Sequence, residues 1–139
     1  MKKHQQGIAL VEALLAVLLL AIGLLGTIGL QARAYSALSE SAMRAEATIA
    51  SEKLLGIISN DQDNASSYVL AAGGTPNALL TSWYNETRSN IPGATIVIAV
   101  AAAPAGTTRR QVDIAISWVR EQGKAPNRQL TTAYISRAS

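Results

Sequence analysis

The chain has 139 residues, enough for one small domain beyond a single membrane-length helix. It has no cysteine, which excludes disulfides and thiol chemistry, and its one histidine is His4. The formal net charge is +3, but Lys2 and Lys3 carry most of it, because residues 8–139 keep 10 of the 12 basic side chains against 9 acidic ones. This balance gives little support to nucleic-acid binding.

Residues 7–30 are almost wholly apolar, with Glu12 near their start. A helix from Ile8 to Leu30 would be about 34 Å long, enough to cross a hydrocarbon core of about 30 Å. A carboxylate inside such a segment is costly unless it is paired, so it predicts a functional role. Cleavage after Gly7 would give Ile8 a charged amine, which could pair with the Glu12 carboxylate of a neighbouring helix.

An ordinary membrane anchor and a secretory signal peptide are the alternatives for this segment. Residues 32–34 (Ala-Arg-Ala) resemble a signal-peptidase site, but the apolar core of a signal peptide runs to about 7–15 residues and this one is longer. The N-terminal lysines predict a cytoplasmic N-terminus and a C-terminal domain outside the cytoplasm.

Two interpretations stay open for three glycines of this segment, close helix packing or local melting of the helix: Gly23, Gly26 and Gly29.

The helix is expected to continue beyond the membrane segment. Apolar residues recur there with 3-4-3-4 spacing, which predicts one stripe on a helix: Tyr35, Leu38, Ala42, Ala45 and Ile49. The polar residues 59–61 predict its end, at about residue 58. A free coiled coil is the alternative, but it would have few large apolar residues at these positions.

A loop, a short helix and three strands are predicted for the remainder. The acidic stretch 61–64 of the loop lacks the glycine and terminal glutamate of an EF-hand, so a solvated loop is favoured over a calcium site. A helix is predicted over 78–89, and strands over 94–102, 112–118 and 130–136. Residues Val112 to Trp118 alternate most clearly, which predicts a small antiparallel sheet covered by the Tyr35–Ile49 stripe, with Trp83 and Trp118 in the core.

The N-terminal pattern resembles the class III signal of type IV pilins. A basic leader, residues 1–7, ends in glycine, and glutamate stands fifth after it. The resemblance implies cleavage between Gly7 and Ile8 by a prepilin peptidase, N-methylation of Ile8, where the family usually has phenylalanine, and an assembly role for Glu12. Three further segments resemble the PilV family of type IV pilus modification proteins, which are minor pilins: residues 21–31, Trp83 with the turn at 91–93, and residues 112–118.

This resemblance implies an α+β type IV pilin fold. It divides the chain into a leader (1–7), a transmembrane and filament-core helix (8–30) and a periplasmic domain (31–139). The implied function is that of a minor pilin in pilus assembly initiation or the tip complex, and so in motility or attachment. The implied partners are minor and major pilins, the prepilin peptidase, the inner membrane and the assembly machinery. The implied location is the inner membrane and then the pilus.

Two rival functions remain, a type II secretion pseudopilin and a pilus-tip adhesin or DNA-binding module. For the last, Arg109 and Arg110 are candidates, although two adjacent arginines are more typical of a solvated turn. No catalytic, metal or cofactor residue is predicted, and no small-molecule substrate. The sequence has no phosphate-binding glycine motif, and a serine nucleophile would lack a histidine base in the mature chain.

Overall fold

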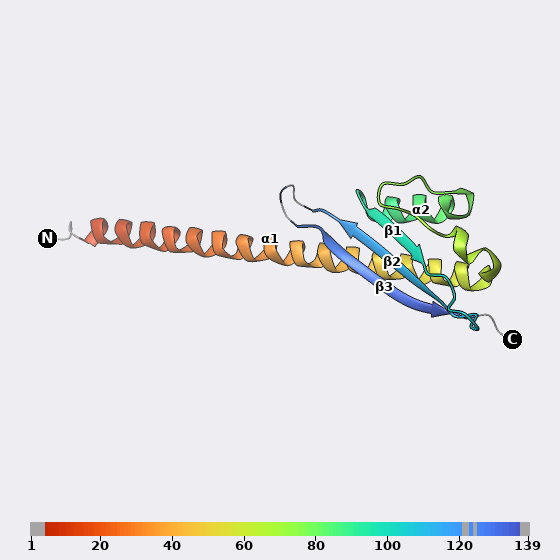
Figure 1. Cartoon of the computed structure of the whole chain (residues 1–139). Coiled ribbons are helices and arrows are strands. Elements are labelled where there is room, and N and C mark those ends of the chain that lie inside the picture. The colour runs from red at the N-terminus through yellow and green to blue at the C-terminus, as the bar shows by residue number, and fades with distance from the viewer. Residues whose placement is uncertain (1–4, 121–122, 124, 137–139) are drawn as a thin grey trace. The chain divides into compact units, whose positions relative to one another are not determined.

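The structure is a computed structural model that describes residues 5–120, 123 and 125–136. Residues 1–4 of the predicted leader lie outside the described residues. The elements follow in the order α1 (Gln5–Asn60), the 3₁₀-helix η1 (Gln62–Ser67), α2 (Ala78–Asn90), β1 (Thr95–Val100), β2 (Arg110–Trp118) and β3 (Asn127–Ile135) (Figure 1). The chain divides into two compact units, Met1–Ser41 and Ala42–Ser139, each of which is described by itself.

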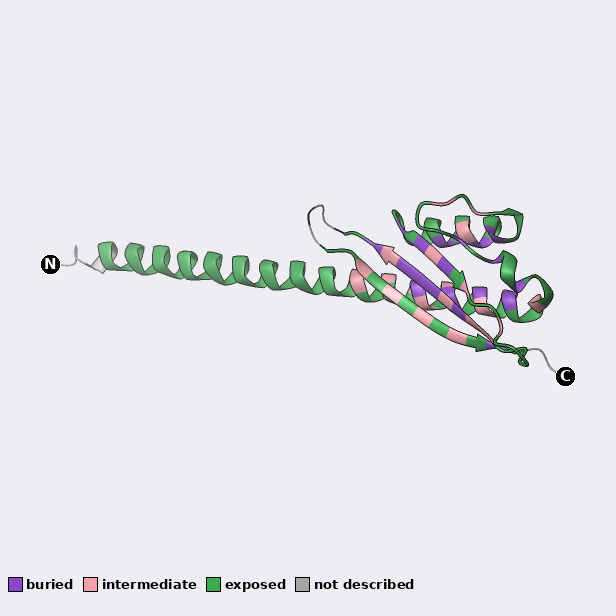
Figure 2. Ribbon diagram, viewed as in Figure 1, coloured by how far each residue is buried: buried purple, intermediate pink, exposed green. Residues whose placement is uncertain are grey.

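The first unit is helical throughout its described residues and buries none of its apolar side chains. An 18-residue window of α1 has a mean hydropathy of 2.8 and is wholly exposed. By length and composition α1 can cross a membrane, although a signal sequence would meet the same test. In Figure 2 this part of α1 is exposed along its whole length, whereas buried residues gather in the strands, in α2 and in the C-terminal part of α1.

The second unit contains a three-stranded antiparallel sheet in the order β1-β2-β3. Its register places Ile98 opposite Ile114, and Ile114 opposite Thr131. The predicted alternation of β2 is confirmed, because Val112, Ile114, Ile116 and Trp118 are all buried on one face. The strand boundaries lie within three residues of the predicted ones, and β2 ends at Trp118 as predicted.

The C-terminal part of α1 covers this apolar face, which confirms the predicted α+β class with a long helix packed on a small antiparallel sheet. The residues that cover it belong to a different stripe from the predicted one: Ala47, Ser51, Leu54 and Ile58, all fully buried. Ala47 and Ser51 are the small members of this stripe. Leu54 and Ile58 then fill the space beneath the strands.

The prediction that Tyr35, Leu38, Ala42, Ala45 and Ile49 cover the sheet is therefore wrong. All five are exposed, and Ile49 is 57% exposed. With 3.6 residues per turn, Ile49 lies about 160° around the helix from Ala47 and Ser51. The spacing was helical, as predicted, but spacing alone cannot tell which of two apolar faces the sheet will take.

The loop predicted over residues 59–78 contains the six-residue 3₁₀-helix η1, and Asp61, directly before it, binds two of its neighbours. One oxygen of the Asp61 carboxylate accepts a hydrogen bond from the Asn64 side chain, and the other accepts one from the Tyr68 hydroxyl, both at 2.8 Å. Burial of Tyr68, then the hydrogen bond and the negative charge of Asp61, raise the pKa of that hydroxyl. The Asp61 carboxylate, which lies in the acidic stretch compared with a calcium loop, thus stabilises the local fold through these two hydrogen bonds.

Candidate functional site

The predicted processing and assembly residues lie together at the start of α1. Gly7, Ile8 and Glu12 are all helical and exposed, and Ile8 is 70% exposed. Ile8 and Glu12 are four residues apart, so they lie on the same face of the helix, one turn from each other. A charge on an Ile8 amine would therefore be close to the Glu12 carboxylate of its own chain.

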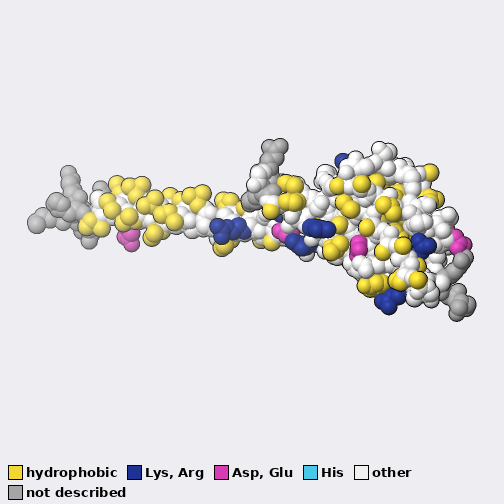
Figure 3. Space-filling model, in the orientation of Figure 1, with side chains coloured by type: hydrophobic (Ala, Val, Ile, Leu, Met, Phe, Trp, Pro, Cys, Tyr) yellow, Lys and Arg dark blue, Asp and Glu magenta, His cyan; other side chains and the backbone are white. Residues whose placement is uncertain are grey.

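Glu12 is the one acidic residue before Glu40, and its surroundings on the helix are apolar. Figure 3 shows acidic colour among hydrophobic side chains in the first part of α1. Because the segment buries nothing within its own unit, the chain itself supplies no cover for the carboxylate among the described residues. In lipid, such a carboxylate would be costly unless an amine or another polar group reached it.

The glycines of the apolar segment have no steric role within the chain. A Cβ atom added at Gly7, Gly23, Gly26 or Gly29 would meet no atom within 4 Å. The helix also continues through residues 23–29 without a break. The described part of the chain therefore gives no steric reason for small residues at these positions.

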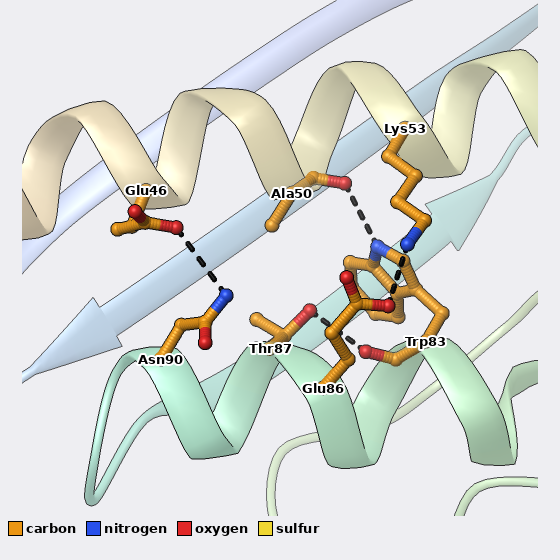
Figure 4. Close-up of polar contacts among 7 residues, drawn as sticks. All are labelled: Glu46, Ala50, Lys53, Trp83, Glu86, Thr87 and Asn90. Carbon is orange, nitrogen blue, oxygen red and sulfur yellow. Dashed lines mark hydrogen bonds and ion pairs between the residues drawn. The ribbon is translucent and has the colours of Figure 1, made fainter.

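The contact between α2 and α1 is the most elaborate side-chain cluster of the second unit (Figure 4). The Trp83 indole N–H donates to the Ala50 carbonyl oxygen of α1 at 2.8 Å. On one side Lys53 pairs with Glu86 at 2.5 Å, and on the other the Asn90 amide donates to Glu46 at 3.4 Å. The cavity between the helices is about 30 Å³, room for one water. This cluster fixes α2 on α1 and offers no space for a substrate.

The buried polar side chains of the second unit are mostly engaged. The Ser51 and Thr87 hydroxyls each donate to the carbonyl four residues earlier at 2.8 Å, which leaves neither poised as a nucleophile. Trp118 is different, because its buried indole N–H has no acceptor among the described residues. The prediction that Trp83 and Trp118 are core residues is confirmed, with 3% and 1% exposure. Their opposite hydrogen-bonding states could not be read from the sequence.

The arginines considered for DNA binding line different hollows. The Arg109 guanidinium lies 4.1 Å from the centre of the Tyr134 ring and lines an open depression of about 420 Å³. Arg110 lines a separate hollow of about 210 Å³, to which Asp63 also contributes. The two side chains therefore do not make one basic surface.

No group of three or more His, Cys, Asp or Glu side chains that could hold a metal occurs within the described part of the chain. Comparisons with protein-family models, with curated proteins and with solved structures find no match to this chain. The case for a function therefore depends on the residues themselves. Among the described residues, the fold makes no use of the side chains of Ile8 and Glu12 or of the small size of Gly7.

Proposed function

We propose that the chain is a minor pilin of a type IV pilus, held in the inner membrane by the first part of α1 before it joins the filament. The observation that supports this most is Glu12. It is a carboxylate one helical turn after Gly7-Ile8, in an apolar segment that none of the residues within its unit covers. A plain anchor has no use for this charge, whereas an assembly that presents an amine to it does.

In this proposal a prepilin peptidase cuts between Gly7 and Ile8. The cut removes the basic leader and creates an α-amine on Ile8, which is the residue expected to be methylated. In the low-dielectric interior of a helix bundle that ammonium and the Glu12 carboxylate of an adjoining subunit neutralise each other. The pairing therefore stabilises the one axial position of each subunit in which its amine reaches the carboxylate of the adjoining subunit.

The C-terminal domain is suited to a subunit that functions outside the cytoplasm without disulfides. Its core has contributions from α1, α2 and all three strands, and the chain contains no cysteine. Minor and major pilins and the pilus assembly machinery are the proposed partners. A role in initiation or at the tip is the finer part of the proposal and follows from the resemblance to the PilV family alone.

N-terminal sequencing of the protein from membranes tests the processing step. We expect the mature chain to begin at Ile8, and Gly7→Val to leave an uncut precursor, because the peptidase requires a small residue there. A mature chain that begins at Tyr35 would establish a secretory signal peptide. An uncut wild-type chain would establish an ordinary anchor.

The variant Glu12→Gln tests the assembly step, with Glu52→Gln as its matched control. Glu52 is an exposed carboxylate on the same helix, in the second unit. We expect Glu12→Gln to be inserted and cut normally, because the leader is untouched and an amide is cheaper than a carboxylate in hydrocarbon. It should then be depleted from purified pili, whereas Glu52→Gln should not. Normal incorporation of both would remove the assembly role. Absence of the wild-type chain from pili, with loss of protein secretion on deletion, would favour the pseudopilin.

A further inference from the structure

The two outer edges of the sheet differ. At the β1 edge, Ile98 exchanges two backbone hydrogen bonds with Leu70, at 2.9 and 3.0 Å. The loop before α2 thus closes the middle of that edge. At the other edge, no backbone group of a described residue outside β2 forms a hydrogen bond with the backbone of β3.

The register shows which backbone groups of β3 are open. Ala101 N–H donates to Gln111 O at 2.9 Å, so the backbone of Gln111 points towards β1. Backbone direction alternates along an antiparallel strand, so Ile114 points instead towards β3, where it pairs with Thr131. The outward direction of Ile98, opposite Ile114, agrees with this assignment.

It follows that every second residue of β3 directs both its N–H and its C=O away from the sheet. These four residues form the β3 edge: Arg128, Leu130, Thr132 and Tyr134. Their side chains are also exposed, on the sheet face away from α1. Natural sheets usually protect a long edge with proline, several charged side chains or a short strand, whereas β3 is nine residues long, contains no proline and has Arg128 as its single charge.

We propose that the β3 edge docks an extended segment of another protein, which adds to the sheet as a fourth strand. Only a polypeptide in extended conformation offers donors and acceptors at the spacing of these open groups. Its side chains would include an acidic one opposite Arg128 and apolar ones opposite Leu130 and Tyr134, which are 53% and 57% exposed.

The charge of Arg128 argues for a different chain over a second copy. Arg128 has no ion pair or hydrogen bond within the described part of the chain, and it is the one charged residue of β3. A second β3 strand would bring no carboxylate to it. A strand from another protein that contains an acidic residue would bring a carboxylate to Arg128. This inference does not depend on the proposed pilin function.

The test uses the full chain in detergent micelles and a synthetic nine-residue peptide of alternating threonine and valine with one glutamate placed to meet Arg128. The control peptide has the same side chains but is N-methylated on the amides that would face β3, so it cannot pair. We expect amide hydrogen exchange at Leu130, Thr132 and Tyr134 to slow by at least about tenfold with the first peptide only. Equal binding of both peptides, or protection confined to other segments, would overturn the proposal.

Two sets of variants sharpen the result. Leu130→Pro removes an outward N–H that β2 does not use, so we expect it to keep the fold and lose the peptide, whereas Leu130→Val should keep both. Arg128→Glu should weaken binding by about fivefold and a peptide with lysine in place of glutamate should restore it. If the Leu130→Pro variant does not fold, the charge exchange at Arg128 still tests the proposal. No effect of the exchange, or a concentration-dependent dimer that protects the same amides without peptide, would contradict docking of a different chain.

Discussion

The two tryptophans provide a matched test of how the core is held together. Both are almost fully buried, but the Trp83 N–H donates to Ala50 O at 2.8 Å, whereas the Trp118 N–H has no acceptor among the described residues. Replacement of either by phenylalanine removes a similar amount of apolar surface. At Trp83 the change also removes a hydrogen bond, which contributes about 0.5–1.5 kcal/mol. At Trp118 it removes an unpaired buried donor, which costs about 1–3 kcal/mol to bury.

The difference between the two variants is therefore the quantity to measure. Since the packing losses largely cancel, we expect Trp83→Phe to be more destabilising than Trp118→Phe by about 1.5–4.5 kcal/mol. Urea denaturation of the full chain in detergent micelles gives both values. The chain has two tryptophans, so each variant retains one as its fluorescence probe. Near-ultraviolet circular dichroism checks that the unfolding transition is cooperative.

Equal losses of stability in the two variants would refute this reasoning. They would mean that the Trp118 N–H is satisfied in solution, by water or by residues outside the described ones. A larger loss of stability in Trp118→Phe than in Trp83→Phe would also refute it. It would mean that Trp118, at the C-terminal end of β2, contributes more to the stability of the core than Trp83 does. A double variant adds a check, since the two sites should be nearly additive if they do not share partners.

Three further predictions concern the second unit. Ile114→Asp should abolish cooperative unfolding, because it places an unpaired charge in a fully buried position, whereas Asp113→Ser should cost only about 1 kcal/mol through lost side-chain hydrogen bonds; urea denaturation compares them. Tyr68 has a raised pKa, so the folded state keeps its proton to higher pH than the unfolded state. Stability measured by urea should thus be intact below about pH 10 and fall as pH rises through the folded pKa, less steeply in Tyr68→Phe. Lys53→Met breaks an exposed ion pair and should change the melting temperature by only a few degrees, within about 1 kcal/mol.

Much of the fold could be predicted because its elements have strong local signals. The length of the apolar segment predicts a helix and the alternation of β2 predicts a strand, and the structure confirms both. The 3₁₀-helix was missed, since Asn, Asp and Ser predict a loop in general and the hydrogen bonds of Asp61 depend on where Tyr68 folds back. Prediction of the helix stripe failed for a different reason. α1 carries apolar or small residues on two opposite faces, and the choice between them is made by the sheet.

For the candidate site, the sequence identifies the residues, and the structure shows their secondary structure and exposure. The sequence indicates Gly7, Ile8 and Glu12 by their spacing, and the structure adds that they share one helix and that no atom of the described residues would obstruct a Cβ at Gly7. The β3 edge could not have been found from the sequence. Its weak alternation gives a strand, but only the register and the bridge at Leu70 show which edge is closed and which is open.

The exposed surface of α1 bears directly on what the chain must associate with. Fourteen large apolar side chains from Ile8 to Leu30 are more than half exposed. Contiguous apolar surface of this kind is not stable in water, so lipid or other helices must cover it. Lipid alone would satisfy these residues but would leave Glu12 uncompensated. A bundle of helices that brings an ammonium to Glu12 satisfies both, and this is why the carboxylate, rather than the hydrophobicity around it, favours an assembling subunit over a simple anchor.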